Sequence, residues 1–107
     1  MEWKMIISLQ EVVTTSGITE DASGRKVFSD SFTTQEILVN TNNIVSVRPV
    51  DVSFLNRLNE SQTTSLKGKQ FCSVFLNRGG VNSTDIVVVG SPNDIMSRVN
   101  KRMLLND

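Results

Sequence analysis

Residues that could carry out acid–base or metal chemistry are scarce in this chain. Its 107 residues include no histidine, no tyrosine and a single cysteine, Cys72. Without histidine, a histidine-dependent triad, a histidine metal site and most general-base schemes near neutral pH are excluded. Zinc would need clusters of cysteine or histidine that the sequence does not contain. We therefore expect neither a metal nor a cofactor.

The other candidates for reactive chemistry have simpler interpretations. Glu20 and Asp21 are adjacent, but they lie in a polar segment with no apolar wall to raise a carboxyl pKa. Gly79 and Gly80 precede a second β-rich run and not a helix, so no helix N-terminus would face a phosphate there. Cys72 sits inside an apolar run, which favours a small buried side chain. The sequence predicts a protein that is not an enzyme.

One group of residues is a candidate contact for a partner protein. Within a polar stretch, an apolar cluster recurs at helical spacing, and it consists of Phe54, Leu55, Arg57 and Leu58. If these side chains close over the sheet they are core. If they stand out from the surface they form an apolar anchor for a partner or for a second copy of the chain.

A second group is a candidate contact for anions or nucleic acid. It consists of Arg48, Arg98, Lys101 and Arg102, three of which lie near the end of an expected helix. Cations at that position also compensate the negative end of the helix dipole, so the cluster has a structural interpretation as well.

The overall charge gives nucleic acid or an anionic membrane no general advantage as a partner. Lys plus Arg and Asp plus Glu each number 11, so the formal net charge is zero. We expect a small binding or regulatory module that acts through contacts with an unidentified protein partner and forms a homo-oligomer. The alternatives are a nucleic-acid-binding module with a basic face on the C-terminal helix, and an oligomeric binder of a small anionic ligand. Salt dependence separates a nucleic-acid partner from a protein partner, because the affinity of phosphate contacts falls steeply with added salt whereas that of an apolar interface does not.

The first half of the chain predicts strands separated by polar loops. Apolar residues alternate with polar ones from Trp3 to Leu9 and the run continues to Thr15, which indicates a long first strand. Residues 16–26 are polar and are expected to form an exposed loop. Residues 27–32 favour at most a short edge strand. Residues 36–40 and 44–50 then favour two strands joined by a tight turn rich in asparagine.

The second half predicts a long loop, a hairpin and a helix. Residues 51–69 lack strand character and are expected to form a long loop with a short helical turn capped by Asp51 or Ser53. Residues 71–76 and 85–89 favour two strands joined at Gly79 and Gly80. A helix should follow from Pro92 to about Leu105, with Ser91 as its N-cap and Asp94 three residues later. Its apolar stripe comprises Ile95, Met96, Val99 and Met103.

The expected fold is a mainly β (α+β) single domain covering residues 1–107. It is a small curled antiparallel sheet or barrel of five to six strands, with one C-terminal α-helix packed on it. No apolar run approaches the roughly 18 residues of a membrane-spanning helix, and the N-terminal residues do not resemble a secretory leader. We expect a cytoplasmic protein that does not bind a membrane.

Residues 37–103 contain, in this order, the runs Ile-Leu-Val-Asn, Ile-Val-Ser-Val, Ser-Val-Phe-Leu-Asn-Arg-Gly and Ile-Val-Val-Val-Gly-Ser-Pro-Asn-Asp-Ile. This order resembles the FlbD-like (SwrD-like) family of small β-domains. That family's pattern is a strand ending in Leu-Asn, an Ile-centred strand, a strand ending in Asn-Gly, and a strand leading into a capped amphipathic helix. The matching positions here are Asn40, Ile44, Gly79, Val88, Ser91 and Ile95. The resemblance implies the fold and no chemical role. Short proteins of this kind also resemble bacteriophage-encoded accessory proteins.

Overall fold

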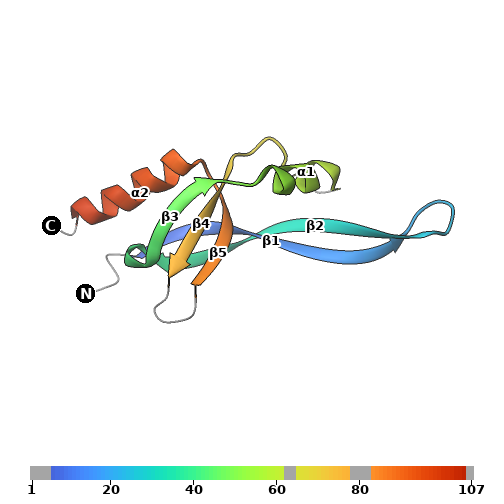
Figure 1. Cartoon of the computed structure of the whole chain (residues 1–107), viewed down its shortest axis with the longest axis horizontal. Coiled ribbons are helices and arrows are strands. Elements are labelled where there is room, and N and C mark those ends of the chain that lie inside the picture. The colour runs from blue at the N-terminus through green and yellow to red at the C-terminus, as the bar shows by residue number, and fades with distance from the viewer. Residues whose placement is uncertain (1–5, 62–64, 78–82, 106–107) are drawn as a thin grey trace.

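The computed structural model describes residues 6–61, 65–77 and 83–105, with side chains described up to residue 100. Those residues form five strands and two α-helices (Figure 1). The strands are β1 (Ile6–Glu20), β2 (Lys26–Asn40), β3 (Ile44–Pro49), β4 (Phe71–Asn77) and β5 (Ser83–Val89). The helices are α1 (Val52–Glu60) and α2 (Pro92–Leu105), and a short 3-10 turn, Thr41–Asn43, follows β2.

The strands form one antiparallel sheet in the order β2-β1-β5-β4-β3. The predicted antiparallel sheet and C-terminal helix are confirmed, whereas the barrel is wrong, because β2 and β3 are the two open edges. The turn Thr41–Asn43 joins these two edges. Four residue steps separate Asn40 from Ile44, and they span at most about 14 Å. The sheet is therefore strongly bent without closing.

The long first hairpin differs most from the sequence-based expectation. β1 and β2 pair residue by residue from Ile6 opposite Asn40 to Glu20 opposite Lys26. The predicted exposed loop at 16–26 is thus reduced to residues 21–25, and residues 27–32 and 36–40 belong to one continuous strand. Serine and threonine dominate the middle of both strands, and these residues are tolerated well when both faces of a ribbon meet solvent.

The two helices cover opposite faces of the sheet. Side chains alternate along each strand, so Cys72, Val74 and Leu76 point to the face covered by α2. Phe71 points to the other face, where it packs in a separate cluster with Leu58 of α1. In Figure 1, α2 and α1 accordingly flank strands β3 to β5 on different sides.

Hydrogen bonds at the helix starts confirm the predicted caps. The Asp94 backbone N–H donates to Ser91 Oγ (3.1 Å), and the Ser91 N–H donates to Asp94 Oδ2 (3.3 Å), which completes a capping box. Asp51 caps α1 by accepting from the Ser53 N–H at 3.3 Å. The segment 51–69, expected to be a loop with a short helical turn, therefore contains a nine-residue helix.

Candidate interaction surface on the β-hairpin arm

The outer part of the first hairpin projects from the body of the sheet. β1 pairs with β5 at Glu11, opposite Val88, and beyond that point β1 and β2 pair only with each other. We call residues 13–33 the arm (Figure 1). The molecule measures 62 × 30 × 21 Å with a radius of gyration of 16.6 Å, where a compact chain of this length would have about 13 Å. The arm makes the protein elongated.

The turn at the end of the arm is ordered by its own hydrogen bonds. Asp21 Oδ1 accepts from the Ser23 N–H (2.9 Å), from Ser23 Oγ (2.7 Å) and from the Arg25 N–H (3.0 Å). These bonds, chiefly the one from the Ser23 hydroxyl, lower the pKa of Asp21. Gly24 adopts a positive φ of 84°, which only glycine takes without strain. The turn fixes which β1 residue faces which β2 residue.

Three apolar side chains near this turn are exposed, namely Ile18, Val27 and Phe28, and we call the pair Ile18 and Phe28 the apolar tip. Ile18 and Phe28 lie directly opposite each other on the same face and are 61% and 85% exposed. Cross-strand neighbours form one continuous patch, which points to an interaction surface more strongly than scattered apolar residues do. Two-stranded ribbons are also marginally stable alone, so a contact there would stabilise the arm.

Helix α1 holds the base of the arm through aromatic contacts. The ring of Phe54 lies edge-on to Phe32 of β2, with centroids 5.6 Å apart, and edge-on to Phe71 of β4 at 5.5 Å. Such arrangements contribute roughly 0.5–1.5 kcal/mol beyond the area they bury. The stack ties the arm, the helix and the sheet together.

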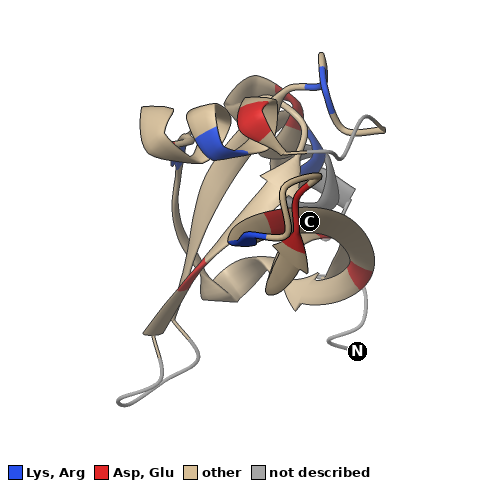
Figure 2. Ribbon diagram, turned by 90° about the vertical axis from the view of Figure 1, so that its right-hand side faces the viewer, with Lys and Arg blue, Asp and Glu red and all other residues tan. Residues whose placement is uncertain are grey.

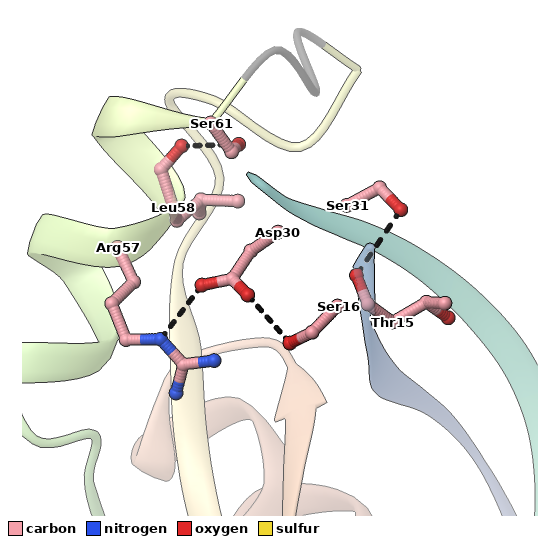
Figure 3. Close-up of polar contacts among 7 residues, drawn as sticks. All are labelled: Thr15, Ser16, Asp30, Ser31, Arg57, Leu58 and Ser61. Carbon is pink, nitrogen blue, oxygen red and sulfur yellow. Dashed lines mark hydrogen bonds and ion pairs between the residues drawn. The ribbon is translucent and has the colours of Figure 1, made fainter. Parts of the chain in front are cut away.

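A polar contact further along the arm adds a second attachment (Figure 3). Asp30 accepts a hydrogen bond from Ser16 Oγ at 2.8 Å, and its other carboxylate oxygen lies 3.0 Å from Arg57 Nε. The Ser16 bond is the larger cause, and Arg57 the next, of a lowered pKa for Asp30. Asp30 therefore links both strands of the arm to α1.

We expect Asp30→Asn to loosen the arm without unfolding the sheet. Because the folded-state pKa of Asp30 is lowered, its stabilising contacts exist at neutral pH and are lost as the pH falls below the usual aspartate range of about 4. Hydrogen-exchange protection of arm amides should fall several-fold in the variant at neutral pH.

The wild type should approach the variant's arm protection below about pH 4, whereas the variant should change less over the same range. Amides of β4 and α2 serve as the internal control and should keep their protection at neutral pH. Equal arm protection in both proteins at neutral pH would show that the Asp30 contacts do not hold the arm.

The structure divides the residues expected to anchor a partner. Leu58 is only 2% exposed, and half-buried Phe54 packs between the rings of the arm and the sheet. These two side chains belong to the core of this chain, which corrects their assignment to a partner-binding surface. Leu55 is 36% exposed, and the half-exposed side chain of Arg57 lies against Asp30 of the arm.

The sequence did carry a signal for the apolar tip that was missed. Ile18 and Phe28 are both five residues from Ser23, at the centre of the segment Asp-Ala-Ser-Gly-Arg. Treating that segment as a hairpin turn places the two apolar residues opposite each other.

The residues expected to form one basic face are not brought together. Arg48 lies on the α1 side of the sheet, 3.8 Å from the carboxylate of Asp85. Arg98 lies on α2, on the other side, and donates to the backbone carbonyl of Ser8. The expectation of a shared face is corrected for this pair; the side chains of Lys101 and Arg102 lie outside the described residues. In Figure 2, basic and acidic segments are interspersed.

Three further features of the described residues bear on metal binding, thiol chemistry and anion binding. Within them, no group of three or more histidine, cysteine, aspartate or glutamate residues could hold a metal ion. Cys72 is fully buried, and burial, with a smaller effect of Asp94, raises the pKa of its thiol to about 11. The hollow beside Arg48 also carries the carboxylates of Asp51 and Asp85, which disfavour an anion.

Comparisons with protein-family models, curated proteins and solved structures found no match for this chain. The resemblance to FlbD-like proteins therefore stays a prediction. Neither helix, over the residues described, has the length and apolar character needed to cross a bilayer.

Proposed function

We propose that this protein is a non-enzymatic binding or regulatory module whose arm makes the functional contact with another protein. The observation that supports this proposal is the apolar tip, in which Ile18 and Phe28 lie exposed side by side on a projecting element. The turn beyond them is held by hydrogen bonds and the arm's base is held by α1. An ordered element loses little conformational freedom when it binds.

The tip offers enough apolar surface to act as a small anchor. Burying the exposed part of the Ile18 or the Phe28 side chain would contribute on the order of 1–2.5 kcal/mol to the free energy of binding. Aromatic and aliphatic anchors of this kind carry most of the energy in many protein interfaces. By comparison, Arg48 and Arg98 lie on different sides of the sheet, which gives a nucleic acid no shared surface at these two positions.

We expect a double substitution, Ile18→Asp with Phe28→Asp, to abolish partner capture while leaving the melting temperature nearly unchanged. Both side chains are mostly exposed, and surface substitutions usually change stability by less than about 0.5 kcal/mol. The measurement is quantitative mass spectrometry of proteins retained by the tagged chain from a lysate of its source organism, for wild type and variant.

Leu38→Asp is the matched control, because Leu38 is 66% exposed on the same strand and the same face but lies at the base of β2. This control should retain the proteins that the wild type captures. If the tip variant stays folded and captures the same proteins as the wild type, the arm is not the contact element.

A further inference from the structure

We propose that the arm's partner is a second copy of this chain, and that two arms pack face to face and antiparallel about a two-fold axis. This inference rests on the proposed function and names the partner of the same surface. It follows from the order of charged and apolar residues along one face of the arm and from a hollow beside that face.

Three rows of cross-strand pairs share the face that carries the tip. Moving from the base toward the turn, the rows are Ser16–Asp30, Ile18–Phe28 and Glu20–Lys26. Consecutive rows are two residues apart, or about 7 Å along the ribbon. The apolar row is thus flanked on one side by the Asp30 carboxylate and on the other by the Lys26 ammonium.

We place the two-fold axis between the two packed faces, perpendicular to the strands and level with the apolar row. It brings the apolar row of one copy over the apolar row of the other. It also brings the Glu20–Lys26 row of each copy over the Ser16–Asp30 row of the other. Lys26 of each copy then lies over Asp30 of the other. The Ile18–Phe28 pairs of the two copies meet at the centre of the contact. Charge of opposite sign and apolar surface are therefore matched by one symmetry operation, as an interface between identical surfaces requires.

A hollow of about 330 Å³ between the arm and the C-terminal end of α1 lies beside Asp30 and provides room for the Lys26 side chain of the other copy. Its lining includes Phe28, Asp30, Arg57 and Glu60. Glu60 is exposed and gives a second carboxylate for the incoming Lys26. Among the contacts described, Arg57 engages Asp30 through Nε (Figure 3), so Glu20 of the other copy can accept from the two outer nitrogens of its guanidinium.

The antiparallel arrangement accounts for more of the structure than its rivals. A parallel pair would place Lys26 over Glu20 but would leave the hollow empty and Arg57 without a second carboxylate. A head-to-tail contact would insert the tip into the apolar groove formed by Pro49, Val50, Leu55, Phe71 and Pro92. That contact does not close on itself and would build chains of growing length.

The first test is analytical ultracentrifugation of the full chain from about 1 µM to about 1 mM, a range that brackets the affinity of a small interface. We expect a monomer–dimer equilibrium for the wild type. Phe28→Asp should weaken the dimer at least tenfold with an unchanged melting temperature, and Leu38→Asp should dimerise as the wild type does.

Charge exchange tests the register of the rows. Lys26→Glu should weaken the dimer, because it places a carboxylate opposite Asp30 and Glu60. Adding Glu60→Lys to the same chain should restore a large part of the affinity, since the incoming glutamate again meets a cation. Failure of the second substitution to restore any affinity would overturn the proposed register.

Spin labels at Ala22→Cys, in the exposed turn, distinguish the two directions. Ala22 is four residues from Ile18, so the labels of an antiparallel dimer should be separated by roughly 30 Å, at 3.4 Å per residue in each arm. In a parallel dimer the two turns would lie side by side. The native Cys72 should label slowly, because it is fully buried and its thiol pKa is raised to about 11.

Any one of four results would overturn the inference. They are a monomer at every concentration, a dimer that Phe28→Asp does not weaken, spin labels that lie next to each other, and head-to-tail chains that lengthen as the concentration rises. The proposed function fails separately. If the pure protein is monomeric but the tip variant still loses captured proteins from the lysate, the partner is a different protein and the arm remains the contact. If the tip variant keeps both its self-association and the proteins captured from the lysate, both proposals fail.

Discussion

Leu58→Asp should unfold the protein or leave it only marginally stable at room temperature. Leu58 is 2% exposed and packs with Val12, Phe32, Leu66 and Phe71 between α1 and the sheet. Truncating such a leucine costs about 2–5 kcal/mol, and an unpaired carboxylate in its place adds several more. Since a domain's total stability is about 5–15 kcal/mol, urea unfolding followed by circular dichroism should show most of that stability lost.

Leu55→Asp is the control on the same helix. Leu55 lies three residues earlier on the accessible side of α1 and is 36% exposed. Its replacement should cost about 1 kcal/mol or less. If both variants unfolded at the same urea concentration as the wild type, α1 would not be packed on the sheet. The four candidate anchor residues, Phe54, Leu55, Arg57 and Leu58, would then again be candidates for a contact with a partner.

Local patterns were sufficient to predict the C-terminal half of the fold. In α2, the apolar spacing of Ile95 and Val99 and the cap formed by Ser91 and Asp94 all act within a few residues. The pairing of β4 with β5 is also local, because only a short connection separates them. Such features depend on short-range sterics and hydrogen bonding, which the sequence displays directly.

The arm was harder to predict because its strands form through their pairing with each other and not through a buried apolar face. Residues 16–20 and 26–31 are largely polar, so no buried face imposes an alternating apolar pattern on them. They become strands because Asp21 and Gly24 fix a turn that pairs every residue of β1 with one of β2. The continuity of the ladder follows from the turn.

The sheet order and the candidate site depend on contacts between distant parts of the chain. β1 lies beside β5, more than seventy residues later, so β2 and β3 become edges although only three residues join them. The burial of Phe54 likewise depends on where Phe32 and Phe71 are brought by that arrangement. The spacing of apolar residues within residues 51–69 indicates an amphipathic helix, but it does not indicate which face of that helix the arm will cover.

Ile95→Ala should destabilise the protein by about 2–5 kcal/mol and lower its melting temperature by more than about 8 °C. Ile95 is 1% exposed in the cluster between α2 and the sheet, and its Cδ1 would lie 3.3 Å from a Cβ placed on Gly90. Ile95 therefore packs closely against the Gly90 backbone, and alanine would lose this contact as well as those within the cluster, so the cost should approach the upper part of that range. Met96→Ala, at the adjacent and 40% exposed position, should change the free energy of unfolding by about 1 kcal/mol or less. Equal losses from the two substitutions in urea unfolding would mean that α2 does not hold the sheet through this face.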